Sequence, residues 1–180
     1  MRWIRRIAVT AIVWCVVLLA ASALPGALPL PTAAIAGSAL LLAVPSFVIT
    51  LFACLLFNVR QTGNRARASR AMFRLVGETV PAGLLIAGGL LFAGFWLVGV
   101  QSVGGAGVPE QRAGEYVTNN HGIVTVISED EYLTLKEQGR RIPVAIAGGL
   151  SVFAAVFSTA LVRREEQRET SATSRGPAPG

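Results

Sequence analysis

The sequence predicts an all-α transmembrane protein, a four-helix membrane bundle with a small extracytoplasmic β-hairpin plus short helix. Hydrophobic residues make up 53% of the 180 residues and charged residues only 14%, whereas a soluble domain carries about 25% charged residues. The mean hydropathy is +0.58. Charged residues are absent from four long apolar blocks and concentrated between them, which is the distribution expected of a chain divided between lipid and water.

The first apolar block covers residues 7–24, after a basic N-terminus at residues 1–6. Its length is near the lower limit for crossing a hydrocarbon core of about 30 Å. A cleaved signal peptide is the alternative, because Ala21-Ser22-Ala23 fits the small-x-small cleavage pattern. We favour a retained helix, since the apolar run exceeds the usual signal-peptide core of about 7–15 residues. Either interpretation places the following residues outside the cytoplasm.

Three further apolar blocks follow along the chain, at residues 33–57, 80–100 and 142–162. Pro45 lies in the middle of the second block, where the missing backbone N–H predicts a kink. Because lipid offers no water to the freed carbonyl, Ser46 or another helix must satisfy it. Pro81 and Pro143 are the second residues of their blocks, so we expect both in a first helical turn.

Arginine placement predicts the orientation of these helices. Residues 1–6, the connector 58–79 and the tail 163–180 together hold twelve of the sixteen Lys and Arg residues. The positive-inside rule therefore predicts that both termini are cytoplasmic, N-in and C-in. Fifteen of the basic residues are Arg, and abundant Ala and Gly accompany them. This composition indicates a high-GC bacterial source, and hence a multi-pass protein of a bacterial plasma membrane.

The connector 58–79 reads as a basic amphipathic helix between residues 64 and 76. Its arginines gather on one side and its apolar residues on another, which favours a position in the headgroup layer. Five arginines are therefore candidate contacts for anionic lipid headgroups: Arg60, Arg65, Arg67, Arg70 and Arg74. For the connector as a whole we favour a topology signal without a specific partner, and a docking site for a partner or a specific lipid is the alternative. Because the arginines flank apolar blocks, we expect lipid and no nucleic acid.

The apolar blocks themselves contain no Asp, Glu, Lys, Arg or His, which counts against a proton-coupled transporter or pump. A transporter or channel for a neutral substrate stays open as an alternative. Hydroxyl side chains could line its path, although we expect them to bond to their own helix backbone: Ser38, Ser46, Thr50, Ser151, Ser158 and Thr159.

Small residues inside the blocks are expected to serve packing. Cys15 and Cys54 lie within apolar blocks, so neither is expected in a disulfide. Gly83 with Ala87, and likewise Gly89 with Ala93, have the small-x-x-x-small spacing that lets helices approach closely. This spacing predicts either packing within the chain or self-association.

The segment 101–141 is the one wet stretch long enough to fold. Its residues 101–114 are Gly-rich and predict a flexible lead. Two runs of β-branched and aromatic residues then flank Asn119-Asn120-His121-Gly122, which predicts a β-hairpin. A short helix should follow, because Ser128 and Glu131 form a capping box, and we expect it to end at Gly139.

This hairpin and helix carry the candidate interaction residues: Tyr116, Asn119, Asn120, His121, Gly122 and Tyr132. Their pattern resembles a segment of uncharacterised small membrane proteins of actinobacteria, in which an Asn-Asn-His-Gly turn likewise precedes an acidic Glu-Tyr helix. The resemblance covers about a tenth of the chain and implies no activity. His121 could serve a membrane enzyme at the outer face, but a metal site normally needs three or more ligands, so we expect neither cofactor nor metal.

The expected function is therefore that of a non-enzymatic interaction or accessory subunit, with a membrane protein or a second copy as partner. The motivation is a helix bundle without buried charge joined to one ordered wet segment. In the tail, residues 163–169 should extend the fourth helix by a turn or two. The remaining residues 170–180 should be disordered, since apart from proline they contain no apolar side chain larger than Ala.

Overall fold

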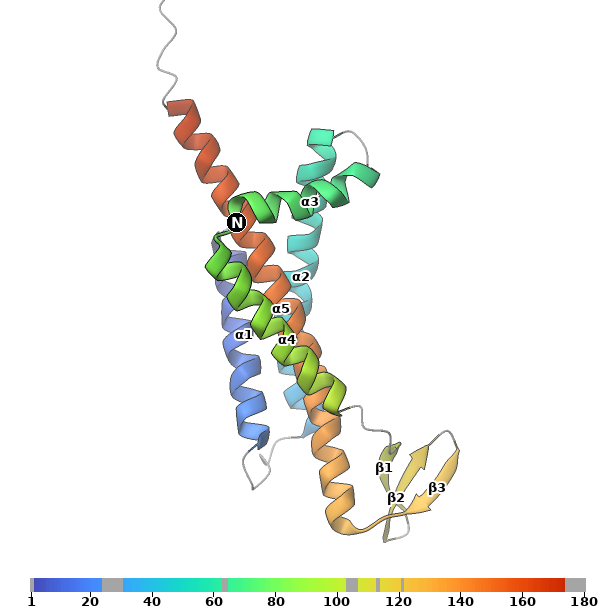
Figure 1. Cartoon of the computed structure of the whole chain (residues 1–180). Coiled ribbons are helices and arrows are strands. Elements are labelled where there is room, and N and C mark those ends of the chain that lie inside the picture. The colour runs from blue at the N-terminus through green and yellow to red at the C-terminus, as the bar shows by residue number, and fades with distance from the viewer. Residues whose placement is uncertain are drawn as a thin grey trace, which may run out of the picture.

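The structure is a computed structural model of the whole chain that describes residues 2–23, 31–62, 65–102, 107–112, 114–120 and 122–173. The elements run in the order α1, α2, α3, α4, β1, β2, β3, α5 (Figure 1). The helices are α1 (Arg2–Ala23), α2 (Thr32–Thr62), α3 (Arg65–Thr79), α4 (Ala82–Ser102) and α5 (Glu129–Thr173). Within the described ranges α1, α2, α4 and α5 are each long and apolar enough to cross a membrane. The four predicted apolar helices are thus confirmed.

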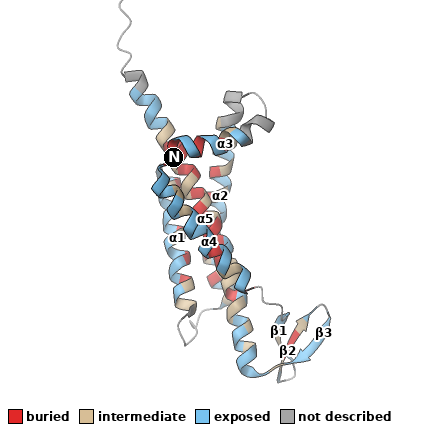
Figure 2. Ribbon diagram, viewed as in Figure 1, coloured by how far each residue is buried: buried red, intermediate tan, exposed pale blue. Residues whose placement is uncertain are grey.

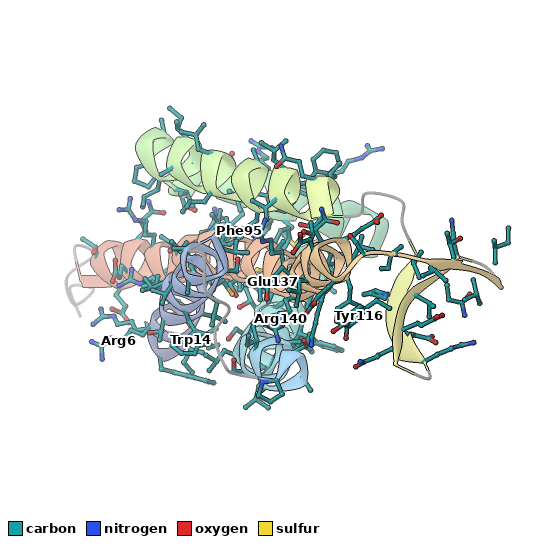
Figure 3. All side chains as sticks on the ribbon, turned by 90° about the horizontal axis from the view of Figure 1, so that it is seen from below. Arg6, Trp14, Phe95, Tyr116, Glu137 and Arg140 are labelled. Carbon is teal, nitrogen blue, oxygen red and sulfur yellow. The ribbon has the colours of Figure 1, made fainter. Side chains whose placement is uncertain are left out.

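Helix α5 is the centre of the bundle. Viewed from below, α4 lies on one side of α5, and α1 and α2 lie on the other (Figure 3). Figure 2 shows buried residues concentrated along α5, whereas most of α4 is exposed. Small residues explain the close approach of α1 and α2, because Ala147, Ser151, Ala154 and Ser158 are all buried along α5.

The packed interior forms two apolar clusters along α5. The first joins α1, α2, α4 and α5 and includes Cys15, Ala43, Phe95 and Ala147. The second lies where the connector helix α3 packs onto α2 and α5, through Met72, Leu75 and Val76 of α3 together with Cys54 and Phe157. Cys15 and Cys54 are both buried thiols outside any disulfide, as expected of packing residues.

Helix α5 is one continuous helix of 45 residues, so the prediction of a separate short helix ending at Gly139 is wrong. Pro143 accordingly lies inside α5 and not in a first turn. Its missing N–H would have bonded to the carbonyl of Gly139, and Gly139 is exposed, so water can take that place. The expected extension over residues 163–169 is confirmed, but the helix continues to Thr173, beyond the predicted start of disorder.

The predictions for Pro45 and Pro81 hold only in part. Pro45 lies inside α2; its ring removes the partner of the Leu41 carbonyl, while the Ser46 hydroxyl donates to the carbonyl of Leu42 at 2.7 Å. Ser46 therefore does not satisfy the carbonyl that proline frees. Pro81 precedes α4, and its carbonyl accepts the backbone N–H groups of Leu84 and Leu85.

A three-stranded antiparallel sheet interrupts the helices between α4 and α5. Its strands are β1 (Val108–Arg112), β2 (Glu115–Asn120) and β3 (Ile123–Val126), in the spatial order β1-β2-β3. The predicted hairpin is confirmed as β2–β3. The prediction of a flexible lead is wrong for the described residues before it, because residues 101–102 complete α4 and residues 108–112 form β1. Gly114 takes a positive φ of 90° where β1 turns into β2.

The bundle has two chemically different ends (Figure 1). The N-terminus, α3 and the last part of α5 lie together at one end, and the sheet lies beyond the other. We call the first the arginine-rich end; the described arginine side chains there are Arg2, Arg5, Arg6, Arg70, Arg74, Arg163, Arg164 and Arg168. Residues far apart in the sequence thus place their positive charges at the same level of the bundle.

Candidate interaction site

The hairpin turn is built by Asn119 and Gly122. The Asn119 side-chain oxygen accepts the backbone N–H of Gly122 at 3.0 Å, and Gly122 takes a φ of 93°, which favours glycine. Asn120 pairs with Ile123 on the opposite strand and is exposed. His121 lies outside the described residues, so its predicted role stays a prediction.

The start of α5 holds the opposite end of the hairpin. Ser128 caps the helix by accepting the backbone N–H of Glu131 at 3.2 Å, which confirms the predicted cap. The rings of Tyr116 on β2 and Tyr132 on α5 lie 4.7 Å apart between centroids, tilted by 33°. The nearby carboxylate of Glu129, which also accepts a hydrogen bond, raises the pKa of Tyr116. Two of the predicted interaction residues, Tyr116 and Tyr132, therefore contact each other within the chain.

The sheet has one face toward α5 and one face away from it. Alternate residues of a strand point to opposite faces, and the Tyr116–Tyr132 contact puts the Tyr116 face toward α5. The register then gathers the side chains of four valines on the other face: Val108, Val117, Val124 and Val126. We call this the valine face. Val117 is buried in the central strand, and the other three are exposed.

The edge of β3 is open and apolar. In an antiparallel ladder, hydrogen-bonded pairs alternate with non-hydrogen-bonded pairs. The backbone N–H of Ile127 donates to Tyr116 at 2.9 Å, so the pairs 118/125 and 120/123 are also hydrogen-bonded. The backbone groups of Val124 and Val126 consequently point away from β2. All four residues of β3 are exposed.

The opposite edge, β1, is blunted. Because residues of the central strand β2 alternate between their two neighbours, Pro109 and Gln111 are the β1 residues whose backbones face outward. Pro109 has no N–H to donate, and the ion pair of Glu110 with Arg112 at 2.6 Å puts charge on this strand. Proline and charge are the usual protections of an edge strand. Among the residues the structure describes, β3 is thus the sheet edge without such protection.

This edge was missed in the sequence. The strand 123–126 was predicted, but a run of Ile, Val and Thr does not indicate which edge of the strand pairs with another strand. Proline within a strand indicates an edge strand, so Pro109 could have identified the other edge. The Gly-rich residues around it, however, predicted a flexible segment and no strand.

The candidate lipid-contacting arginines are only partly described. Arg70 is exposed, and Arg74 pairs with Glu78 at 2.7 Å; the side chains of Arg60, Arg65 and Arg67 lie outside the described part of the structure. The apolar face of α3 packs on α2 and α5, so this helix rests on the bundle with its polar side outward. Arg70 lies on that outward side, and its predicted contact with a lipid headgroup stays a prediction.

A polar junction that sequence reasoning also missed fastens α5 to α1 and α2 near the sheet. Arg140 bonds to the Thr32 hydroxyl at 2.9 Å and to Glu137 at 2.7 Å, and Arg141 donates to the carbonyl of Ser22 at 2.8 Å. Arg140 is buried at this junction. Figure 3 shows Arg140 and Glu137 where α5 faces α2.

The hydroxyls proposed for a pore mostly bond to their own helices. Those of Ser38, Ser46, Ser151, Ser158 and Thr159 donate to backbone carbonyls three or four residues earlier, as predicted. The hydroxyl of Thr50 is buried without a hydrogen-bond partner. Among the residues the structure describes, His, Cys, Asp and Glu do not gather in groups of three. Comparisons with protein-family models, with curated proteins and with solved structures found no match.

Proposed function

We propose that this chain is a non-enzymatic accessory subunit of a bacterial plasma membrane, which binds a partner protein by strand addition at β3. The observation that carries the proposal is the open edge formed by Val124 and Val126, whose outward backbone groups and exposed side chains lie on an uncharged strand. An extended segment of a partner can pair with such an edge through backbone hydrogen bonds, while alternate side chains meet the valine face.

The proposed orientation places the sheet outside the cytoplasm. Its support is the arginine-rich end, where the N-terminus, α3 and the end of α5 meet at one level (Figure 1), as the positive-inside rule requires of cytoplasmic segments. We further propose that α1 is retained. Arg2 pairs with Glu166 at 3.1 Å, and the Trp14 indole donates to Ser38 at 3.2 Å, so cleavage after residue 23 would remove a packed helix.

Orientation and retention have simple tests. Alkaline phosphatase fused after residue 180 should be inactive, whereas the enzyme inserted at Gly114 should be active, because it works only outside the cytoplasm. The intact mass of the purified protein should equal that of the full chain. Activity of the fusion after residue 180, or a mass lacking the first 23 residues, would contradict this placement.

Photo-crosslinking tests the binding edge. A photoreactive phenylalanine analogue at Val124 should yield one discrete adduct in intact cells, and mass spectrometry of that adduct should identify a different polypeptide. Val126→Lys should abolish the adduct, because a lysine on an edge strand blocks pairing. Val108→Lys is the matched control, since Val108 is 64% exposed and Val126 is 65% exposed on the same face but at opposite edges.

Each outcome decides the proposal. Loss of the adduct in Val126→Lys alone supports strand addition at β3. An adduct between two copies of this chain would show that β3 mediates self-association and does not bind a different protein. If no adduct forms, or if both lysine variants lose it equally, β3 is not the binding edge. Size-exclusion chromatography of both variants must show the same elution as the parent chain.

A further inference from the structure

A groove at the arginine-rich end combines an apolar floor with two arginines. It has a volume of about 400 Å³ and lies between α1, α4 and α5. Val9 and Val13 of α1, Leu84 and Leu91 of α4, and Val152 and Val156 of α5 form its walls, and Arg5 and Arg163 also line it. Among the described helices only α5 lies within backbone contact distance of α4, so no helix fills the space between α1 and α4.

The length of the groove matches one leaflet of a bilayer. Its α5 wall runs from Val152 to Arg163, a rise of about 16 Å at about 1.5 Å per residue. Half of a hydrocarbon core of about 30 Å is about 15 Å. An acyl chain entering beside the arginines would therefore be covered over its whole depth in that leaflet.

Arg5 and Arg163 differ from two neighbouring arginines, which form ion pairs. Arg2 forms an ion pair with Glu166 at 3.1 Å, and Arg164 lies 3.8 Å from Glu78. Among the described residues, no carboxylate forms an ion pair with Arg5 or Arg163. The guanidinium of Arg163 only approaches the backbone carbonyl of Thr79, at 3.5 Å. Guanidinium groups with free donors recognise phosphate well.

A second groove on the other flank of α4 shows what the arginines add. It has a volume of about 500 Å³, and residues such as Phe92, Trp96 and Phe153 line it, without any charged side chain. Lipid chains can cover such a surface without regard to headgroup. The groove beside α1 differs because two arginine side chains and an apolar wall line the same site.

We infer that this groove binds one anionic phospholipid, with an acyl chain between α1 and α4 and its phosphate between Arg5 and Arg163. The lipid would belong to the leaflet at the arginine-rich end, whichever side of the membrane that end faces. The site is therefore independent of partner binding at β3 and requires only that the bundle be embedded in lipid. By filling the gap, the lipid would tie α4 to α1.

Native mass spectrometry of the full chain in neutral detergent tests this inference, with phosphatidylglycerol and phosphatidylcholine as the probes. One phosphatidylglycerol should be retained in preference to phosphatidylcholine. The double variant Arg5→Gln/Arg163→Gln should bind it about 10- to 30-fold more weakly, given roughly 1 kcal/mol per arginine. The matched control Arg6→Gln/Arg164→Gln removes the same two charges one residue away and should bind as the parent chain does.

A third variant tests the acyl chain. Ala87 lines the groove, so Ala87→Phe should reduce phosphatidylglycerol retention while leaving both arginines in place. Inorganic phosphate at millimolar concentration should not displace the lipid, because the apolar wall contributes to binding. All variants must first show the helical circular dichroism and elution volume of the parent chain.

The opposing results are equally definite. Equal weakening in both double variants would show that net charge alone attracts the lipid, and the site would be abandoned. Equal retention of the two phospholipids, or displacement by inorganic phosphate, would also overturn it. A failed crosslink at β3 would leave this result untouched, because the two experiments probe opposite ends of the bundle.

Discussion

The two sides of α5 are held by different forces. Toward α1 and α2, side-chain hydrogen bonds connect the helices, notably Arg140 to Thr32 and Arg141 to Ser22. Toward α4 the contact is apolar: Phe95 packs over Gly148, and Phe92 lies against Gly149. Among the described residues, no side chain of α4 hydrogen-bonds to another element.

The difference follows from composition. Within a membrane the hydrophobic effect does not drive helices together, so association depends on close packing and on polar contacts. The α4 side depends on packing alone, through glycines that let aromatic rings approach the α5 backbone. We therefore expect the packing of α4 on α5 to be sensitive to changes in side-chain size. The packing of α1 and α2 on α5 should be sensitive to the loss of hydrogen-bond donors.

The largest expected effect is that of Gly148→Leu. A Cβ at Gly148 would overlap the ring of Phe95, which is itself buried, so a larger side chain should push α4 away from α5. An engineered disulfide reports this contact. A Cβ at Gly99 would lie 3.5 Å from the Cβ of Ala145, within the range that a disulfide requires. Oxidised Gly99→Cys/Ala145→Cys should therefore crosslink, and adding Gly148→Leu should prevent it.

Gly139→Leu is the control in the same helix, because nothing lies within 4 Å of a Cβ there. That variant should crosslink as efficiently as the double-cysteine chain alone. Crosslinking that persists in Gly148→Leu would mean that α4 does not depend on this close approach, and the contrast between the two sides would fail.

Arg140→Ala should have the next largest effect. Its pair with Glu137 is shielded, with side chains 11% and 25% exposed, and removal leaves both Glu137 and Thr32 without this partner. Hydrogen bonds to charged groups contribute roughly 1.5–3 kcal/mol, so the thermal midpoint in detergent should fall by about 4–10 °C.

Arg112→Ala provides the comparison for Arg140→Ala. The Arg112–Glu110 pair is 55% and 36% exposed, and such exposed pairs contribute at most about 1 kcal/mol. If both alanine variants lowered the midpoint equally, burial would not explain the role of Arg140, and the junction would be no stronger than a surface ion pair.

The polar junction around Arg140 could not be predicted from the sequence, whereas local features could. The Ser128 cap and the Asn119–Gly122 turn depend on residues three positions apart, and both were predicted. In contrast, Arg140 and Arg141 of α5 bond to partners 108 and 119 residues away, Thr32 and Ser22. The local pattern of Gly139 followed by Pro143 predicts a break in the helix, and contacts with residues so far away in the sequence cannot be read from a local pattern.

The candidate site shows the same limit. Tyr116 and Tyr132 were singled out as separate residues, and only the fold makes them a pair. Strand β1 escaped detection because residues 108–112 lack the alternation of a strand and acquire their structure by pairing with β2. Without β1, the sequence could not show that β2 is the central strand or that β3 has the open edge.

Trp14→Phe should produce a smaller change on the α1/α2 side. It removes the donor to Ser38 at 3.2 Å, and hydrogen bonds between membrane helices average about 0.6 kcal/mol. The thermal midpoint should fall by about 1–3 °C. Trp96→Phe on α4 is the matched control, because Trp96 is exposed on the side governed by packing. A larger loss in Trp96→Phe would reverse the comparison.

The smallest expected effect concerns the point where α5 meets the sheet. The carboxylate of Glu129 raises the pKa of Tyr116 by repulsion and by accepting its hydrogen bond, so this contact is polar, like the α1/α2 side. The stability it contributes is fully present below the unfolded tyrosine pKa of about 10 and is lost as pH rises through the higher folded value. Because the chain has two tyrosines, tyrosinate absorbance can follow both during an alkaline titration. Glu129→Gln should bring one transition to lower pH, whereas Asp130→Asn should not. If the titration of Glu129→Gln were unchanged, the Tyr116 contact would depend on packing alone. The sheet would then be held to α5 by apolar packing, in the same way as α4.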